Sequence, residues 1–237
     1  MRTVLITGGT GGLGKELCRL FKENGYTVLF TYNNGIITDE LKDCYSFKCD
    51  FRNEEEINKM LDEINSKFQV DILINNAAIE YDTEFNNKTK QDFIETLEVN
   101  LVAPFLISRN LGLKMYERKY GKIINISSNN SINKYDPVTL EYDSSKAGLN
   151  VLTKNLAKEF APLVNVNAVA PGWILTDKIK KLDESLNNKF IEEESKKILL
   201  NRFATCEDIG NLALFLASDK ANYINGEIIR IDGGSYE

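Results

Sequence analysis

The hydrophobic positions fall into short apolar runs separated by longer stretches with helical spacing. Most runs are apolar throughout instead of alternating with polar residues, a pattern typical of strands covered on both faces. Strands that alternate with helices predict a parallel sheet with right-handed crossovers. The predicted strands are Thr3–Thr7, Thr27–Tyr32, Ser46–Cys49, Ile72–Asn75, Lys122–Ser127, Val164–Val169 and Glu227–Ile231. We therefore expect an α/β, doubly wound fold in which helices cover both faces of a parallel seven-stranded sheet.

One domain is expected across residues 1–237. Glycine and proline are sparse, at 15 and 4 residues, and the chain shows neither a low-complexity linker nor an internal repeat. Charge is crowded into one short helical stretch, Trp173–Leu200, where a lysine-rich segment is followed by a run of glutamates. This stretch has two interpretations, a solvated helical hairpin or a lid over a substrate cleft.

The charge balance and the residue types narrow the classes of function. The formal net charge of −6 gives no reason to bind nucleic acid or an anionic membrane. No apolar run approaches the roughly 18 residues of a membrane-spanning helix, and no signal peptide is visible. The four cysteines contain no CxxC pair, which favours reduced thiols in a cytoplasmic protein. Because the chain has no histidine, we expect no metal site and no histidine general base.

A glycine-rich turn connects the first predicted strand to a helix at Lys15–Asn24. The segment TGGTGGLG starts at Thr7 and places Gly8, Gly12 and Gly14 in the turn. Where no Cβ intrudes, a pyrophosphate can approach the free N–H groups and the positive dipole end of the helix. Strand, glycine turn and helix in this order predict a dinucleotide-binding site.

A tyrosine and a lysine are spaced to act together. Tyr142 and Lys146 lie four residues apart in a predicted helix, so they share one face. An ammonium beside a phenol lowers the pKa of the phenol, as a general acid–base group near neutral pH requires. We expect Tyr142 to be the proton donor and Lys146 to be the group that adjusts its pKa.

A proline interrupts the helix predicted at about Thr89–Lys114. Pro104 has no N–H to pair with the carbonyl four residues earlier, which belongs to Asn100. The helix is expected to kink there, and the Asn100 carbonyl is expected to find a water or side-chain partner. A tolerated kink without a function is the alternative.

These motifs, and others in the same order along the chain, resemble the short-chain dehydrogenase/reductase family, which has a Rossmann fold. The spacing TGxxxGxG, the sequence Asn75-Asn76-Ala77-Ala78 and the closing GxxxxxDGG are similar to its signatures, with Ala78 in place of a glycine. The resemblance implies a catalytic tetrad of Asn100, Ser128, Tyr142 and Lys146. It also implies that a dinucleotide is bound by Thr7, Gly8, Thr10, Gly12, Leu13, Gly14, Asn33, Asp50, Phe51, Asn76, Ala77, Ala78, Tyr142, Lys146, Pro171, Gly172, Ile174 and Thr176.

The resemblance also implies a role for each member of the tetrad. In the family the serine hydroxyl polarises the substrate carbonyl, the asparagine carbonyl holds a water that links the lysine to solvent, and the lysine holds the nicotinamide ribose. Ser128 is the aligned serine; Ser127 is the alternative, disfavoured because adjacent side chains of a strand point to opposite faces. The residues expected to line the substrate cleft are Glu80, Tyr81, Asn129, Asn130, Tyr135 and Trp173, together with the segment that follows Trp173.

The choice of nicotinamide cofactor is finely balanced. The second predicted strand ends in Tyr32-Asn33-Asn34, with no carboxylate to bind the ribose 2′-hydroxyl of NAD or to repel the 2′-phosphate of NADP. The arginine that NADP-preferring relatives often carry in the glycine turn or after this strand is also absent, and Gly11 occupies the first of these places. We expect NADP, with NAD as the alternative.

Among family members, the chain is most similar to 3-oxoacyl-acyl-carrier-protein reductases. This likeness implies hydride transfer between a carbonyl and a secondary alcohol on a small-molecule substrate, such as an acyl thioester. Those reductases receive an acidic carrier on arginines near the cleft, whereas this chain has Lys119 and Pro162-Leu163 at the matching places. A polyol, sugar or secondary-alcohol dehydrogenase and a non-catalytic dinucleotide-sensing scaffold are the alternatives. Because family members assemble through the two long helices, here Thr89–Lys114 and Tyr142–Phe160, we expect a homotetramer.

Overall fold

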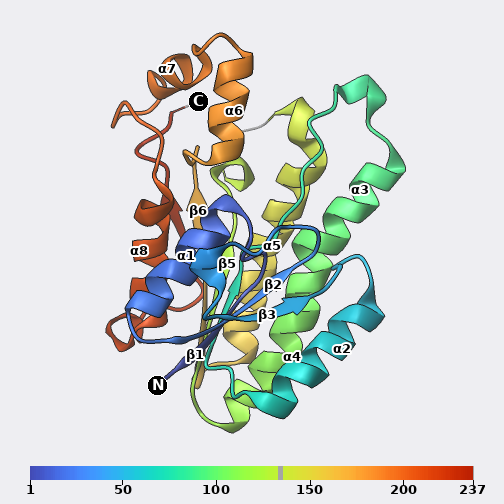
Figure 1. Cartoon of the computed structure of the whole chain (residues 1–237), viewed down its shortest axis with the longest axis vertical. Coiled ribbons are helices and arrows are strands. Elements are labelled where there is room, and N and C mark those ends of the chain that lie inside the picture. Colours follow the sequence, from blue (N-terminus) through green and yellow to red (C-terminus); the bar gives the residue numbers. More distant parts are fainter. Residues whose placement is uncertain (133–135, 237) are drawn as a thin grey trace.

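The structure, a computed structural model, describes residues 1–132 and 136–236. Its centre is a seven-stranded sheet in the order β3-β2-β1-β4-β5-β6-β7, and every neighbouring pair of strands is parallel (Figure 1). The doubly wound α/β fold is therefore confirmed, and each strand overlaps its predicted range. The strands are β1 (Thr3–Ile6), β2 (Thr27–Tyr32), β3 (Tyr45–Lys48), β4 (Ile72–Asn75), β5 (Gly121–Ile126), β6 (Val164–Pro171) and β7 (Ile228–Ile231).

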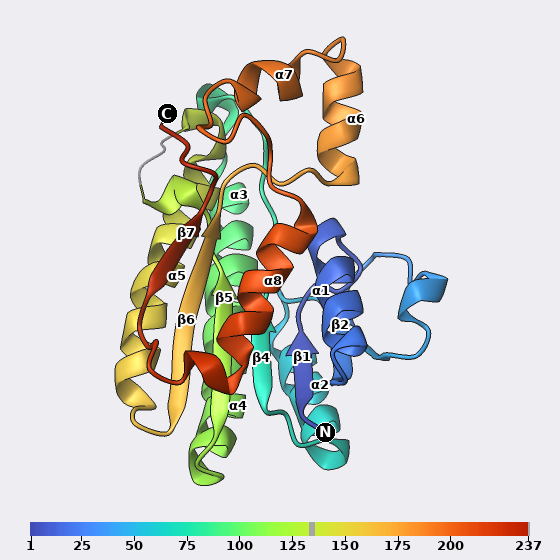
Figure 2. The same ribbon diagram turned by 90° about the vertical axis from the view of Figure 1, so that its left-hand side faces the viewer.

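Two layers of helices cover the sheet, because successive residues of a buried strand point to opposite faces. Leu5 of β1 packs in one apolar cluster, and its neighbours Val4 and Ile6 pack in the other. Figure 2 shows α4 and α5 on one side of the sheet and α1 and α8 on the other. The first cluster contains side chains of α2 (Glu54–Lys67), α4 (Ala103–Glu117) and α5 (Leu140–Glu159), and the second contains those of α1 (Gly12–Glu23) and α8 (Cys206–Ala217).

The strand order reverses beside β1, which pairs with β2 on one side and with β4 on the other. In open α/β sheets, ligands bind in the crevice at the carboxyl ends of the strands where the order reverses. The glycine turn follows β1 and the Asn75–Ala78 segment follows β4, so both predicted signatures meet at this crevice.

The long helix predicted at Thr89–Lys114 is not continuous. α3 (Lys90–Leu97) leads into a π-helical segment, Glu98–Val102, before α4 begins at Ala103. Pro104 lies in the first turn of α4, where a missing N–H is tolerated. The irregularity expected at Asn100 takes the form of a π-helical segment, a feature often found at functional sites.

The segment predicted at Trp173–Leu200 folds as two short helices, α6 (Asp177–Ser185) and α7 (Phe190–Ser195), neither of which contains a buried residue. Both lie beyond the carboxyl end of the sheet (Figure 2). Three aromatic rings anchor the segment: Trp173 stacks on Phe203 with 5.7 Å between ring centroids, and Phe190 meets both rings edge-on. Apolar packing thus holds the base of the segment, whereas its helices are solvated.

Shorter elements complete the chain and are single turns of 3-10 helix at Asp39–Leu41, Phe85–Asn87, Asn129–Ser131, Pro137–Thr139 and Asp219–Ala221. Within residues 1–132 and 136–236, no helix is both long enough and apolar enough to cross a membrane. In the same part of the chain, no group of three or more Cys, Asp or Glu side chains is arranged to hold a metal ion.

Candidate active site

The glycine turn leaves room for a phosphate group at the start of α1. Gly8 has a φ of +68°, and a Cβ added there would lie 2.9 Å from the Cα of Ala77. A Cβ on Gly14 would lie only 2.1 Å from the Gly8 carbonyl oxygen. No side chain caps α1, so its first N–H groups are available to an anion. These features fit the pyrophosphate of a dinucleotide.

Two side chains hold the glycine turn against the segment after β4. The buried Thr7 hydroxyl accepts hydrogen bonds from the backbone N–H groups of Asn76 and Ala77, both at 2.9 Å. In return, the Asn76 side-chain amide donates to the carbonyl oxygens of Thr7 at 2.8 Å and Gly8 at 3.3 Å. Thr7 therefore supports the turn from behind instead of facing the crevice.

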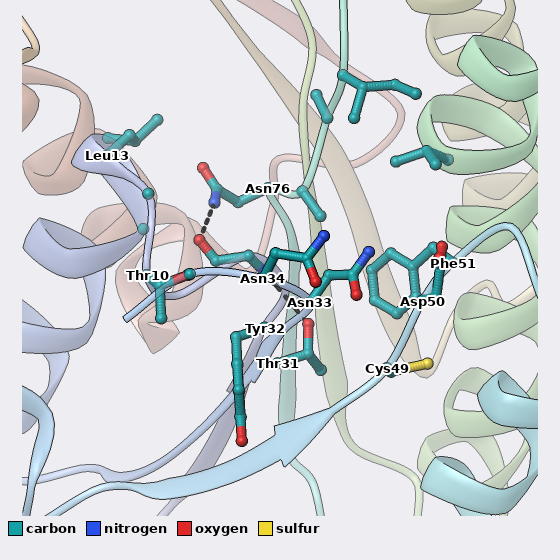
Figure 3. A pocket seen from close by; sticks show the side chains of 18 of the residues that line it. Thr10, Leu13, Thr31, Tyr32, Asn33, Asn34, Cys49, Asp50, Phe51 and Asn76 are labelled. Carbon is teal, nitrogen blue, oxygen red and sulfur yellow. Dashed lines mark hydrogen bonds between the residues drawn. The ribbon is translucent and has the colours of Figure 1, made fainter. Parts of the chain in front are cut away.

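A cavity of about 530 Å³ opens beside this turn and has the size of a ligand site (Figure 3). The end of β2 and the segments that follow β3 and β4 complete its wall. The predicted cofactor residues that line it are Gly8, Thr10, Gly12, Leu13, Gly14, Asn33, Asp50, Phe51, Asn76, Ala77 and Ala78. Asn34, considered with Asn33 at the end of the second strand, lines the cavity as well. Sequence reasoning did not assign a cofactor role to the other lining residues, which are Gly11, Thr31, Tyr32, Gly35, Cys49, Arg52, Ile79, Tyr81 and Val99.

The predicted cofactor residues after β6 do not line this cavity. Pro171 ends β6, where it pairs with Ile231, and a Cβ on the next residue, Gly172, would lie 2.8 Å from the Asp232 Cβ. Ile174 bridges to Ala204. Of this group, Thr176 comes near the glycine turn: a Cβ on Gly12 would lie 3.0 Å from its Cγ2. Its hydroxyl accepts from the backbone of Ile179 and so caps α6.

An arginine lines the cavity from a third place, outside the glycine turn and the end of β2, where the sequence has none. Arg52 lies between β3 and α2, and its guanidinium donates to both carboxylate oxygens of Asp50 and to Glu95. These bonds lower the pKa of Asp50 to about 2. Asn33 also contacts the Asp50 carboxylate, and Figure 3 shows both near Phe51. Because two carboxylates pair with Arg52, its charge is largely neutralised.

The tetrad residues Tyr142 and Ser128 meet where β5 leads toward α5. The Ser128 hydroxyl acts on the Tyr142 phenol and lowers its pKa, against the opposite effect of burial. The adjacent Ser127 faces elsewhere: its hydroxyl contacts the Asn150 side-chain oxygen at 2.7 Å and Ser131 at 3.1 Å. The structure therefore agrees with Ser128, and not Ser127, as the serine beside the tyrosine.

Burial decides the protonation of Tyr142 and Lys146. Lys146 is 2% exposed, its Nζ donates to the Ile126 carbonyl oxygen at 2.8 Å, and burial lowers its pKa to about 8. Burial, followed by the charge of Glu80, raises the pKa of Tyr142 above its ordinary value. The net shift in the pKa of Tyr142 is therefore upward, opposite to the downward shift expected from Lys146. The ammonium lies over the tyrosine ring, 5.4 Å from its centroid, and desolvation dominates.

Asn100 joins the tetrad to the segment after β4. Its fully buried side chain accepts from the Ile79 N–H at 2.9 Å and donates to the Ile79 carbonyl oxygen at 2.8 Å. The same amide donates to Ser145 at 3.1 Å, one residue before Lys146. The side chain therefore fixes both the cleft wall and the helix that carries Tyr142.

A second cavity, of about 450 Å³, lies against Tyr142 and is lined by Ala78, Ile79, Glu80, Tyr81, Tyr142 and Lys178. Of the predicted cleft residues, Glu80 and Tyr81 line it. Asn130 instead donates to Asp143, and Trp173 belongs to the aromatic cluster. Asn129 is buried beside Gly172, and Tyr135 lies outside the described residues. Lys178 reaches the cleft from α6, so the segment after Trp173 does line it, although the sequence did not single out this residue.

The positions matched to the carrier-binding arginines lie at the amino ends of β5 and β6, at the end of the sheet opposite the cleft. Lys119 precedes β5 and Leu163 precedes β6, whereas Ser128 follows β5. The expectation that these positions lie near the cleft is therefore wrong within a single chain, because the length of the sheet separates them from Tyr142.

Comparison with known proteins supports the assignment that this geometry suggests. The family model described as enoyl-(acyl carrier protein) reductase matches residues 8–236. A 3-oxoacyl-acyl-carrier-protein reductase from Aquifex aeolicus is 39% identical over 98% of this chain and 96% of its own length.

Solved structures agree over a similar length. One, described as an NAD(P)-dependent gluconate 5-dehydrogenase from Beutenbergia cavernae with bound NADP, has a TM-score of 0.88 and 30% identity and covers 98% of this chain and 95% of that one. Another, ElxO with NADP bound, has a TM-score of 0.91 and 29% identity and covers 99% of this chain and 98% of that one. Together with the tetrad and the glycine turn, these likenesses show that the chain is an oxidoreductase of the short-chain dehydrogenase/reductase family.

Proposed function

We propose that this protein reduces the ketone of a 3-oxoacyl thioester to a secondary alcohol, with NADPH as the hydride donor. The observation that carries the proposal is the Tyr142–Ser128 hydroxyl pair, which lies beside a cavity that adjoins the dinucleotide crevice. The relative from Aquifex aeolicus, whose name states this reaction, supports the choice of substrate. The tetrad also weighs against a non-catalytic scaffold.

Each tetrad residue has a role that its contacts support. When bound, the reduced nicotinamide supplies a hydride to the carbonyl carbon. The Ser128 hydroxyl donates to the carbonyl oxygen and polarises it, and Tyr142 delivers its proton to that oxygen as the alcohol forms. Because burial raises the pKa of Tyr142, the phenol stays protonated at neutral pH and can act as the acid in reduction. Asn100 positions the cleft wall and the helix that carries Tyr142, and Lys146 would hold the nicotinamide ribose of a bound cofactor.

The cofactor proposal is NADP, with NAD as the alternative. Asn33 and Asn34 line the cavity at the end of β2, where a carboxylate would repel a 2′-phosphate. Both solved structures compared above hold NADP, and one is described as NAD(P)-dependent. Thr7 is proposed to support the cofactor site from behind the glycine turn. Four residues at the end of β6 and after it are proposed to shape the site from the side, and they are Pro171, Gly172, Ile174 and Thr176.

A sugar or polyol dehydrogenase is the second candidate function. The gluconate 5-dehydrogenase neighbour favours it, as does the polar wall that Glu80 and Lys178 give the substrate cavity. The two candidate functions use the same tetrad and differ in the substrate group that contacts Glu80 and Lys178.

Further parts of the proposal concern organisation. Residues 1–237 form one domain in which residues 173–200 are the substrate lid, because α6 supplies Lys178 to the cleft. Exposed apolar side chains on α4 and α5, including Leu113 at 53% and Val151 at 61% exposure, support a homotetramer. The free thiols of all four cysteines suit the cytoplasm.

The test is the variant Tyr142→Phe, assayed by NADPH absorbance with a short 3-oxoacyl thioester. We expect turnover to fall by at least about 100-fold, because general acid catalysis typically contributes 10² to 10⁴. Cofactor affinity, measured by fluorescence titration, should stay within about threefold of the parent. Tyr223→Phe, at a fully exposed tyrosine, is the matched control. Retention of most activity by Tyr142→Phe would overturn the proposed role.

A further inference from the structure

A charged pair stands at the wall of the substrate cavity. The Lys178 Nζ of α6 lies 2.5 Å from Glu80 Oε1, and Asp82 Oδ2 lies 3.8 Å from the same ammonium. The segment after β4 thus offers two carboxylates to one lysine, which leaves the group with a net charge of −1. Both partners of the closer pair remain in contact with solvent, with side-chain exposures of 33% for Glu80 and 65% for Lys178.

The pair faces the reacting group. Glu80 and Lys178 line the same cavity as Tyr142. The charge of Glu80 acts on both Tyr142 and Lys146, raising the pKa of each relative to burial alone. A substrate whose carbonyl contacts Tyr142 therefore places its neighbouring atoms against a carboxylate and an ammonium.

The chemistry of this wall selects among substituents. A hydrogen-bond acceptor and a donor lie side by side, so a neutral group that both donates and accepts can bond to both of them. A hydrocarbon substituent would remove water from the two charges without replacing its hydrogen bonds, which is unfavourable. A carboxylate substituent would meet two acids and one lysine, so it would be repelled.

Resting on the reaction proposed above, we propose that the Glu80–Lys178 pair determines substrate specificity by binding a neutral group that both donates and accepts hydrogen bonds, close to the reacting carbonyl. Two sources carry this chemistry: the amide in the arm of an acyl thioester, and the hydroxyl groups of a keto sugar. The lid segment supplies one half of the pair and the segment after β4 supplies the other, so recognition requires both to be in place.

The experiment compares acetoacetyl thioesters that differ only in the arm: N-acetylcysteamine with its amide, a hydrocarbon arm of equal length, and an arm that ends in a carboxylate. A neutral ketose is the fourth substrate. We expect the parent enzyme to favour the amide arm over the hydrocarbon arm by about 10-fold in kcat/KM, the effect of one or two hydrogen bonds. Lys178→Met removes the donor and should reduce this preference to within about threefold, whereas Glu80→Gln keeps an acceptor oxygen and tests the charge.

The carboxylate arm gives a change of opposite sign. Glu80→Gln should raise kcat/KM for the carboxylate arm relative to the amide arm by about fivefold, because one of the two opposing negative charges is removed. Lys178→Met should lower the same ratio. Lys180→Met is the matched control, since Lys180 also lies on α6 but pairs with Asp177 outside the cavity, and it should keep the parent preferences.

The outcomes separate the two proposals. Parent-like preferences in both Glu80→Gln and Lys178→Met would overturn the specificity role while leaving the reductase activity intact. If the ketose had a higher kcat/KM than every thioester, and if that kcat/KM fell in Glu80→Gln and Lys178→Met, the role of the pair would be supported. The substrate would then be a sugar instead of a thioester. The absence of turnover of all four substrates with either nicotinamide would overturn both proposals.

Discussion

The Thr7 hydroxyl is expected to hold the dinucleotide turn together, and Thr7→Val tests this directly. Valine keeps the branched shape of the side chain and removes only the hydroxyl. Thr7 is 2% exposed, and its hydroxyl accepts two backbone hydrogen bonds at 2.9 Å from the segment after β4. In Thr7→Val, both of those N–H groups lose their acceptor.

The magnitude follows from these two bonds. An unsatisfied buried polar group costs about 1–3 kcal/mol. Asn76 and Ala77 are half-buried, so water can partly replace the lost acceptor, and the lower end of that range applies. Two such groups lower the free energy of unfolding by about 2 kcal/mol. For a chain of this size, that loss corresponds to a decrease in Tm of about 4–8 °C.

Urea denaturation and thermal melting measure the change, and titration with NADPH measures its effect on the site. Thr27→Val is the matched control, because within the described residues the Thr27 hydroxyl donates only to the sulfur of Met1, and valine suits a strand. The control should stay within about 0.5 kcal/mol of the parent. Thr7→Val should also bind NADPH more weakly, since the turn is less well held. Equal stabilities of the two variants would refute the reasoning.

Three other predictions concern the cofactor, the pH profile and assembly. The parent is expected to prefer NADPH over NADH by roughly 10-fold, about 1.4 kcal/mol. Asn33→Asp should reduce or reverse this preference, because a carboxylate would repel the 2′-phosphate. The measurement is kcat/KM with each cofactor, and an unchanged ratio would contradict the prediction. Because the pKa of Lys146 is about 8, its ammonium is lost as pH rises through that value, so kcat/KM for reduction should fall there. The Glu80 carboxylate raises that pKa, so the inflection should move to lower pH in Glu80→Gln; an inflection that does not move would count against the assignment. Light scattering at micromolar concentration should report a tetramer, and a monomer would remove the case for the exposed faces of α4 and α5 as interfaces.

The sequence by itself determined the features whose physics is local. Alternation of apolar runs with helical spacing predicted the parallel sheet, because burial on both faces requires apolar residues throughout a strand. The glycine turn between a strand and a helix predicted the dinucleotide crevice, and four-residue spacing placed Tyr142 and Lys146 on one helix face. Pro104 predicted an irregularity at Asn100, because the missing N–H acts within the same helix.

Only the tertiary structure decided the features that depend on long-range contacts or on burial. Lys178 meets Glu80 across 98 positions of sequence, and Thr7 meets Asn76 across 69, so neither contact has a local pattern. Burial reversed the expected shift in the pKa of Tyr142, because desolvation depends on every element packed around the group and not on the nearest charge in the sequence.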